Sequence, residues 1–373
     1  MEIPFKKTYY DSRETACIRD ALYSGTDYIS KAKALLAEQY GTPNIFLTAS
    51  GSAAIDLLFC ALALEQGSEI IMPSFTFPSC ANTAIRAGLK IVFADIDIHT
   101  KVLDMDDVLR KTSSKTRYIA TMHYGGCSLD MDRLQSCTEG VLLFEDAALS
   151  YGARYKGRPL GSIGDMGIVS FHHTKNISSG EGGMLIVHEK HGDLLEKLQT
   201  LYDNGTDRYD YSAGNVGAYT WQAAGMNAAM SNIQAALLFA QLNKSEEILD
   251  KQKAIYEYYQ NALSDLSKEF GFSLPHIPEY NQNNCHVYYL MFENNQAREM
   301  VREHMNRSGI GAYIHYMPLH SSGMGKKLGY KAIDLPVTQS VSERILRLPI
   351  YADMQTADCG RIVSVLKEAL CKK

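Results

Sequence analysis

The sequence predicts an α/β protein with a large domain, built on a mostly parallel β-sheet with helices on both faces, and a smaller C-terminal α/β domain. Two observations lead to this prediction. Short β-branched runs alternate with amphipathic stretches of helical length through the first half of the chain, which is typical of parallel sheets. With 373 residues the chain is also too long for one ordinary core. We expect a large domain over residues 1–249 and a small domain over residues 250–373.

Seven apolar runs in the first half are expected to form strands. In chain order they are Asn44–Thr48, Glu69–Met72, Ile91–Asp95, Arg117–Met122, Val141–Glu145, Gly167–Phe171 and Met184–His188. Helical patterns such as Gly51–Leu64 and Pro78–Ala87 lie between them. Because ligands bind beyond the carboxyl ends of strands in such sheets, the residues that directly follow these strands are the first candidates for a functional site.

The second half is expected to begin with a long helical region, roughly Ser231–Leu263, and to pass through a loop at Pro275–Asn284. A second alternation of strands and helices then follows. Its expected strands are His286–Phe292 and Ala312–Tyr316, and its expected helices are Ala297–Ser308, Ser340–Arg347 and Thr356–Cys371. This alternation indicates the smaller α/β domain.

Composition excludes several classes of partner. The net charge of −5 gives no basic footprint for nucleic acid. No stretch reaches the roughly 18 consecutive apolar residues of a membrane helix, and the first fifteen residues lack the apolar core of a signal peptide, so we expect a cytoplasmic protein. None of the eight cysteines forms a CxxC pair, so we expect no metal site and interpret them as small buried side chains.

The segment Ser50-Gly51-Ser52 directly follows the first expected strand and opens a helix. Small residues let backbone N–H groups approach an anion closely, and the start of a helix adds a partial positive charge. The segment is therefore a candidate phosphate site. The alternative is ordinary helix capping by Ser50 or Ser52.

Two ionisable residues follow other strands. Asp146 follows the buried run Val141–Phe144, and an acid at such a place usually has a partner. The protonated ring nitrogen of pyridoxal phosphate would be one such partner. The alternative is that Asp146 caps the next turn. Lys175 lies in the run Ser170–Asn176. It can reach back to the strand ends and form a Schiff base, with Ser170 holding a phosphate. The alternative is a solvated loop lysine.

An aromatic residue, Phe77, follows the strand Glu69–Met72 and is suited to stacking on a flat ring, unless it belongs to the core. Each of these signals has a structural alternative. Their shared location at strand ends is what gives them weight.

Taken together, the residues resemble the sugar aminotransferases of the DegT/DnrJ/EryC1/StrS family. The resemblance rests on EDAA at 145–148, SFHHTKN at 170–176, GEGG at 180–183 and MSNIQAALLFAQL at 230–242, and it extends over essentially the whole chain. It implies the aspartate-aminotransferase fold, fold type I of the pyridoxal-phosphate enzymes, with a three-layer α/β/α large domain. FHHTKN and YTW at 219–221 further imply amino transfer from L-glutamate to dTDP-4-keto-6-deoxyglucose, giving dTDP-4-amino-4,6-dideoxygalactose for cell-surface polysaccharide or deoxysugar biosynthesis.

The resemblance also implies roles for residues that would touch the cofactor. Lys175 matches the lysine that forms the Schiff base and moves the proton, and Asp146 matches the partner of the pyridinium. The stacking aromatic and the phosphate cradle correspond to Phe77, Gly51, Ser52 and Ser170.

Four further positions match parts of the family's site that involve a second subunit or the substrate. Asn227 matches a residue that reaches the phosphate from the neighbouring subunit, which implies a homodimer with shared active sites. His315, Tyr316 and His320 match a pattern near the sugar-nucleotide pocket, for which a purely structural role is an equal alternative.

The chain departs from the family in two places. The family usually has Gln after EDAA, hydrogen-bonded to the cofactor, where this chain has Leu149; one lost hydrogen bond costs roughly 1–2 kcal/mol. The loop Ser24–Asp27 is shorter than the loop near the substrate in similar members. The first departure affects the tuning of the cofactor site, and the second affects sugar specificity. Neither changes the class of reaction.

Four alternative functions remain open at this point. They are a 3-keto-sugar aminotransferase, a pyridoxal-phosphate-dependent sugar dehydratase, a sensor on the same fold, and a flavin or nicotinamide enzyme. The dehydratases in this family replace the lysine with histidine, so Lys175 favours transamination. No GxGxxG follows the first strand to support a dinucleotide.

Overall fold

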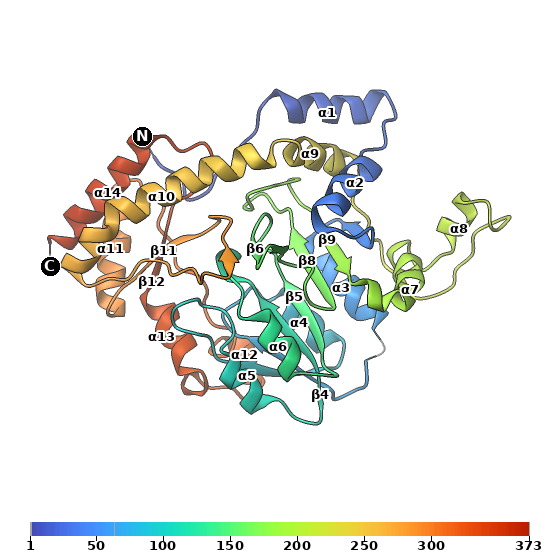
Figure 1. Cartoon of the computed structure of the whole chain (residues 1–373), viewed down its shortest axis with the longest axis horizontal. Helices are drawn as coiled ribbons and strands as arrows, with labels where there is room; N and C mark the ends of the chain where they lie inside the picture. Colours follow the sequence, from blue (N-terminus) through green and yellow to red (C-terminus); the bar gives the residue numbers. More distant parts are fainter. Residues whose placement is uncertain (1, 63, 373) are drawn as a thin grey trace.

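A seven-stranded sheet forms the centre of the computed structural model, which describes residues 2–62 and 64–372 (Figure 1). The strand order is β1-β9-β8-β5-β4-β2-β3. The strands are β1 (Ile45–Thr48), β2 (Glu69–Pro73), β3 (Lys90–Ala94), β4 (Thr116–Met122), β5 (Leu142–Asp146), β8 (Met166–Ser170) and β9 (Gly183–Val187). All seven confirm the predicted strands to within one residue at either end.

Only β9 runs against its neighbours in this sheet; it pairs antiparallel with both β8 and β1, while the other pairs are parallel. The strands are buried along almost their whole length, which explains their near-continuous apolar sequences. The predicted mostly parallel sheet is therefore confirmed.

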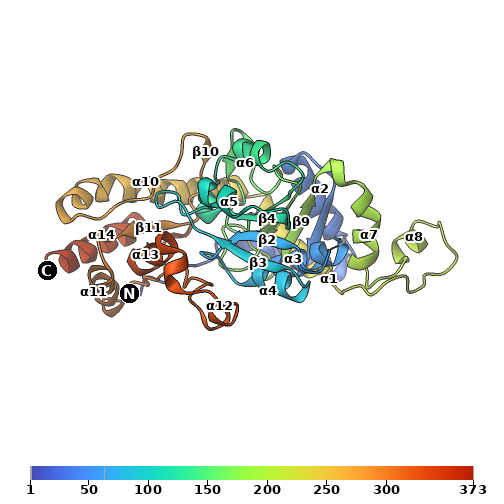
Figure 2. The ribbon, with the colours of Figure 1, turned by 90° about the horizontal axis from the view of Figure 1, so that it is seen from below.

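Helices cover both faces of the sheet and make three layers (Figures 1 and 2). One face packs against α3 (Gly51–Ala61), α4 (Ser79–Arg86) and α7 (Asp193–Tyr202). The other face packs against α2 (Tyr28–Tyr40), α5 (Met105–Lys111), α6 (Met131–Cys137) and α9 (Asn232–Leu242). The predicted helix Gly51–Leu64 ends at Ala61; position 63, within the predicted range, lies outside the described residues.

A second core, apart from the central sheet, is formed mainly by the C-terminal third of the chain. It contains β11 (Tyr288–Met291) paired antiparallel with β12 (Ile345–Leu348), together with α10 (Ser245–Phe270), α11 (Asn295–Arg307) and α14 (Thr356–Leu370). The expected long helical region is thus two helices, α9 and α10. The expected domain boundary at residue 250 falls inside α10, and the division into two domains stays a prediction.

The remaining elements are short. A small sheet contains β6 (Arg154–Tyr155), β7 (Arg158–Pro159) and β10 (Asn281–Gln282). The short helices are α8 (Arg208–Ser212), α12 (Gly323–Lys327) and the 3-10 turns η1 (Tyr124–Gly126), η2 (Glu189–His191) and η3 (Ala332–Asp334). The segment around α8 projects away from the rest of the molecule in both views (Figures 1 and 2). Among the described helices, none combines the length and the apolar character needed to cross a bilayer.

Two predictions for the C-terminal third were wrong. The expected strand Ala312–Tyr316 makes only an isolated bridge, between Tyr313 and Arg347, because the chain then turns toward the central sheet. The expected helix Ser340–Arg347 is instead the end of α13 (Pro336–Arg344) followed by β12. A proline at the first turn starts α13 early, and the buried run Ile345–Leu348 is needed to pair with β11.

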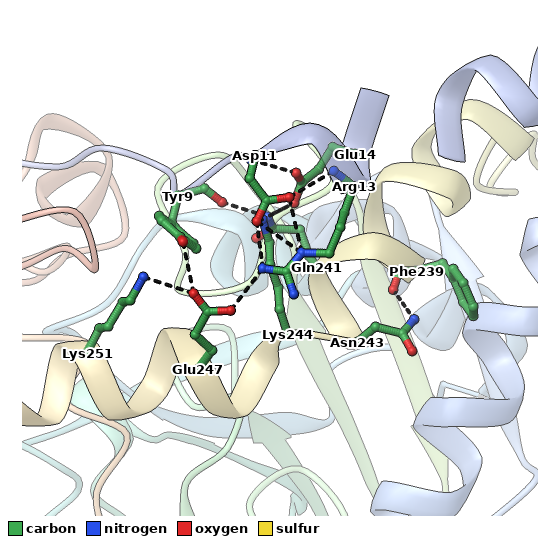
Figure 3. Close-up of polar contacts among 10 residues, drawn as sticks. All are labelled: Tyr9, Asp11, Arg13, Glu14, Phe239, Gln241, Asn243, Lys244, Glu247 and Lys251. Atoms are coloured by element: carbon green, nitrogen blue, oxygen red, sulfur yellow. Dashed lines mark hydrogen bonds and ion pairs between the residues drawn. The ribbon is translucent and has the colours of Figure 1, made fainter. Parts of the chain in front are cut away.

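The helix α1 (Ser12–Tyr23), which was not predicted, lies against α9 (Figure 1). Its start is marked by a capping box between Asp11 and Glu14. The same two acids surround the fully buried Lys244, whose Nζ lies 2.5 Å from Glu14 Oε1 and 3.1 Å from Asp11 Oδ2 (Figure 3). Gln241 Nε2 also donates to Glu14 Oε1 at 2.6 Å. This buried cluster attaches the N-terminal segment to the junction between α9 and α10.

Candidate active site

A cavity of about 400 Å³ opens at the carboxyl ends of β1, β2, β4, β5 and β8, which is where the sequence placed the site. Its other wall comes from the second core and from the N-terminal segment. The cavity brings together eight of the predicted site residues: Gly51, Ser52, Phe77, Asp146, Ser170, Lys175, His315 and Tyr316.

Lys175 lies in the loop between β8 and β9. The ladder pairs Ser170 with Gly183, so the loop is closed at its base by the antiparallel strands. The backbone N–H of Lys175 donates to His172 O at 2.9 Å, which fixes the residue near the strand end. Burial lowers the pKa of Lys175 to about 8, with Asp146 opposing this shift and the charge of Arg347 adding to it. A substantial fraction of the amine is therefore neutral near physiological pH.

The two neighbouring acids at the end of β5 have different surroundings. Glu145 is fully buried and accepts hydrogen bonds from His123 Nε2 (2.8 Å) and from the backbone N–H groups of Gly161, Ile163 and Gly164. Asp146 lines the cavity, and among the described residues its carboxylate accepts a single hydrogen bond, from the N–H of Ala148 at 3.1 Å. Burial raises the pKa of Asp146. Glu145 is thus a structural acid, and Asp146 faces the cavity with capacity for a cationic partner.

The segment that opens α3 combines the two roles considered from the sequence, helix capping and a place for an anion. Ser50 Oγ caps the helix by accepting from Ala53 N at 3.1 Å, so the capping alternative holds for Ser50. Gly51 is packed so closely that a Cβ there would lie 3.3 Å from Ser170 Cβ. The first N–H groups of a helix have no partners within it, and they are available to an anion.

A second helix begins at the same place. Ser52 Oγ lies 2.6 Å from Ser79 Oγ, and Ser79 is the first residue of α4 and also lines the cavity. Ser79 was not predicted as a site residue, although it follows β2 and opens a helix, as Gly51 does after β1. The two helix starts and the serine hydroxyls form one cradle suited to a phosphate.

Of the two phenylalanines that follow β2, Phe75 is fully buried in the core and Phe77 is not. The alternative of a core residue therefore does not apply to Phe77. Phe77 is 62% exposed at the cavity. A large aromatic that remains exposed in a ligand cavity is suited to covering a flat ring.

Two predicted residues do not line the cavity. Asn227 is exposed and makes a backbone bridge with Asp203; its expected role in a neighbouring subunit's site stays a prediction. His320 is fully buried, with Nδ1 2.6 Å from Ser74 Oγ and Nε2 3.3 Å from Ala332 O. These contacts favour the structural alternative for His320.

The second core and the N-terminal segment supply residues that the sequence analysis missed, among them Lys6, His286 and Arg347. Lys6 Nζ donates to Asn176 Oδ1 at 3.3 Å and to Ile350 O at 3.1 Å, and it lies 3.4 Å from His286 Nδ1. None of them follows a strand of the central sheet, so the rule that located the other residues could not find them.

Two further features of the site are Leu149, where the chain departs from the family, and a group of three side chains with metal-ligating atoms. Leu149 lines the cavity where the family usually has Gln, and its carbonyl accepts from Asn284 Nδ2 at 2.9 Å. Ligand atoms of His172, His173 and Glu181 lie within 4.8 Å of one another, a grouping that the sequence analysis did not consider. His173 and Glu181 are exposed, and no further observation points to an ion there.

The residues present fit pyridoxal phosphate. The cavity offers a cradle for the phosphate, an acid for the ring nitrogen that has no ion pair in the described part of the chain, an aromatic for the ring and a lysine with a lowered pKa. This set, at the strand ends of a three-layer α/β/α sheet, defines a pyridoxal-phosphate-dependent enzyme of fold type I.

Comparisons with known proteins place the chain more closely. Residues 12–367 match the DegT/DnrJ/EryC1/StrS aminotransferase family. The chain is 29% identical to the spore coat polysaccharide biosynthesis protein SpsC of Bacillus subtilis, over 98% of this chain and 96% of that protein. The chain belongs to this family, as its sequence motifs predicted, and the family uses pyridoxal phosphate.

Solved structures share the fold. The PLP form of the putative sugar aminotransferase Spr1654 from Streptococcus pneumoniae has a TM-score of 0.92 at 23% identity, with 100% of this chain and 99% of that chain covered. AtS13 from Actinomadura melliaura has a TM-score of 0.88 at 25% identity, with 98% of each chain covered.

Proposed function

We propose that this protein transfers the amino group of L-glutamate to a nucleotide-linked 4-keto-6-deoxyhexose, most specifically dTDP-4-keto-6-deoxyglucose, giving dTDP-4-amino-4,6-dideoxygalactose. Membership of the aminotransferase family supports the class of reaction. The names of SpsC, a polysaccharide biosynthesis protein, and of Spr1654, a putative sugar aminotransferase, support a sugar acceptor and a role in polysaccharide biosynthesis. The single observation that carries the proposal is that the half-buried Lys175 and the buried Asp146 line one cavity, because the reaction needs both a free amine and a fixed acid.

The proposed reaction assigns a task to each cavity residue that would touch the cofactor. When bound, pyridoxal phosphate supplies an electron sink beside the reacting carbon. Lys175 Nζ would hold the cofactor covalently and, as a free amine, would take the proton from the donor's α-carbon. The carboxylate of Asp146 holds the proton on the ring nitrogen.

The remaining residues fix the position of the cofactor. Gly51, Ser52 and Ser170 hold its phosphate, and Phe77 covers one face of its ring. Asn227 completes the phosphate site of a second subunit, so we propose a homodimer.

The proposal is tested with purified protein and isotopic label. The visible absorption of the lysine-bound cofactor should disappear when L-glutamate is added, and with ¹⁵N-glutamate the label should appear on the sugar in one-to-one ratio to the 2-oxoglutarate formed. NMR of the product decides between amination at C4 and at C3. A Lys175→Ala variant is the control and should show neither change. A dehydrated sugar without label would instead support the dehydratase, and loss of both signals in the wild type would leave a non-catalytic cofactor-binding protein.

A further inference from the structure

A second cavity, of about 290 Å³, lies apart from the cavity that contains Lys175. It opens between the loop that joins β3 to α5 and three parts of the second core, which are the chain after α10, the end of β11 and the end of α13. The two cavities have no lining residue in common. The proposed reaction therefore gives this second cavity no task.

A buried lysine, Lys101, lines the second cavity. It is only 3% exposed, and its backbone has a φ of 64°, a conformation that residues other than glycine rarely adopt. Its Nζ donates to His99 O at 3.1 Å and to Ile98 O, and it lies 4.9 Å from the centroid of the Tyr289 ring. A charged lysine has three N–H donors, so one donor is left without an acceptor among the described residues.

No anion of the chain balances the charge of Lys101. In the described part of the chain, no carboxylate lies within the 4.0 Å of an ion pair with its Nζ. Asp97, in the same loop, instead accepts from the backbone N–H groups of His99 at 3.0 Å and Thr100 at 2.7 Å. Lysines are almost never fully buried unless they are paired, because an unpaired buried charge is costly. The missing partner of Lys101 is therefore an anion from outside the chain.

A second cation, Arg344, faces the same space. It lines the cavity, it is half-buried, and its Nε donates to Ser340 O at 3.3 Å. Burial lowers the pKa of Lys101 to about 8; Asp97 opposes this shift, and the charge of Arg344 adds to it. The two cations are thus close enough to repel each other, and an anion between them would relieve that repulsion.

The rest of the lining is consistent with an anion that carries an apolar body. The exposed rings of His99 and His276 lie 6.3 Å apart and can add donors, while the only acid among the described lining residues is the exposed Glu293. Three apolar residues complete the lining: Leu274, Met291 and Phe292. A free anion would leave these apolar side chains without a partner.

We infer that the second cavity binds a small organic phosphate, with the phosphate group between Lys101 and Arg344. A phosphate dianion offsets both cations, which a single carboxylate does not. The ammonium of a lysine and the planar fork of an arginine both suit phosphate oxygens. A cavity of about 290 Å³ with apolar lining approaches the size of sites for small organic ligands and exceeds what a free phosphate needs. The inference rests on these residues alone and does not depend on the proposed function.

The experiment uses the enzyme loaded with pyridoxal phosphate and freed of excess cofactor, so that the cradle at the starts of α3 and α4 is occupied. Calorimetry measures the binding of phenyl phosphate, inorganic phosphate, benzoate and phenol. Phenyl phosphate should bind most tightly, and inorganic phosphate about 10-fold more weakly, because it buries no apolar surface. Benzoate should bind more weakly than phenyl phosphate, and phenol should not bind.

Two variants locate the site. Lys101→Met and Arg344→Gln should each weaken the binding of phenyl phosphate about 10-fold or more, because each removes a charged donor. Arg307→Gln is the matched control: it removes an exposed cation of α11 that does not line this cavity, and it should leave the affinity unchanged. All three variants should keep the rate of the reaction with L-glutamate within about 3-fold, since none of these residues lines the cavity of Lys175.

Three results would overturn the inference: no binding of phenyl phosphate to the wild type, binding that neither Lys101→Met nor Arg344→Gln weakens, or benzoate binding as tightly as phenyl phosphate. Inorganic phosphate binding as tightly as phenyl phosphate would overturn the organic ligand in favour of free phosphate. Thermal unfolding is recorded for each variant. If Lys101→Met does not fold, Arg344→Gln decides, because Arg344 is only half-buried. A wild type that fails to react with L-glutamate would overturn the proposed function and leave this test unaffected.

Discussion

The amine of Lys175 loses its proton more readily than that of an exposed lysine because burial disfavours its charged form. A pKa of about 8 means that the neutral amine predominates above that pH and declines below it. We expect covalent capture of added pyridoxal phosphate by the cofactor-free protein to accelerate with rising pH, with a midpoint near 8. Stopped-flow absorbance over a pH series measures this rate. A midpoint close to that of an ordinary lysine would contradict the assignment of the low pKa to Lys175.

Loss of the charge at Asp146 and loss of the charge at Glu145 should have opposite effects on the stability of the protein. Asp146→Asn removes a buried carboxylate whose pKa is raised by burial, so the cofactor-free protein should be at least as stable as the wild type, while the half-reaction with glutamate slows at least about 100-fold. Glu145→Gln disturbs an acid with four hydrogen-bond donors and should cost about 2–3 kcal/mol of unfolding free energy. Thermal melts and single-turnover kinetics separate the two effects. Equal destabilisation by both substitutions would be evidence against a free Asp146.

At the scale of elements, the contact between β9 and α3 leaves no room for a side chain. A Cβ on Gly183 would lie 2.5 Å from the backbone nitrogen of Gly51 and 2.6 Å from its Cα. We expect Gly183→Ala to push the start of α3 out of place and to weaken binding of pyridoxal phosphate about 10-fold or more, since the backbone groups at the start of α3 are part of the cradle. Gly323→Ala, where a Cβ meets nothing within 4 Å, is the control. Fluorescence titration of the cofactor-free proteins compares the two, and unchanged affinity of the Gly183 variant would show that α3 does not form the cradle.

The buried cluster at the α9–α10 junction sets the stability of the N-terminal segment. Lys244→Met leaves the buried Glu14 without its cation and should lower the free energy of unfolding by about 3 kcal/mol. Lys251→Met removes a 40% exposed lysine from the adjacent helix α10 and should cost less than about 1 kcal/mol. Urea denaturation followed by circular dichroism measures both. Similar losses for the two variants would mean that Lys244 contributes no more than a surface pair.

How well an element can be predicted depends on where its signal lies. The central strands are continuous apolar runs between turn residues, and their sequence alone locates them to within one residue. Arg347 lies in a run that has both helical and strand character, and only the pairing of β12 with β11 decides between them. For this reason its place at the cavity was missed, although Asp146, at the end of β5, and Lys175, in the loop after β8, were placed correctly in the cavity.

Contacts between distant segments explain the rest of the differences. Nothing in the local sequence around Lys6 indicates that its amine meets Asn176 and Ile350, because these partners are separated from it by 170 and 344 positions. The helix α1 carries a local signal, the capping box of Asp11 and Glu14, and attention to it would have located the start of that helix.

At the scale of the whole molecule, the exposed Asn227 offers a test of shared sites. If Asn227 completes the site of a partner subunit, Lys175→Ala and Asn227→Ala homodimers both have defective sites, whereas a mixed dimer has one intact site. Random mixing of the two variants in equal amounts should restore activity in about one quarter of the sites. Activity after co-refolding, compared with that of each variant alone, measures this. Activity that stays at the average of the two variants would indicate that Asn227 serves no neighbouring site.

The segment around Lys6 also has a consequence for how the chain is made. During synthesis this segment leaves the ribosome 344 positions before Ile350, whose carbonyl it finally binds. At translation rates of about 5–20 residues per second, it waits roughly 17–70 seconds for that partner. The cavity wall that contains Arg347 is completed equally late, so the segments that carry Gly51 and Lys175 are made long before the cavity can close. Release of the C-terminal third from the ribosome is thus the step at which this protein acquires a closed site.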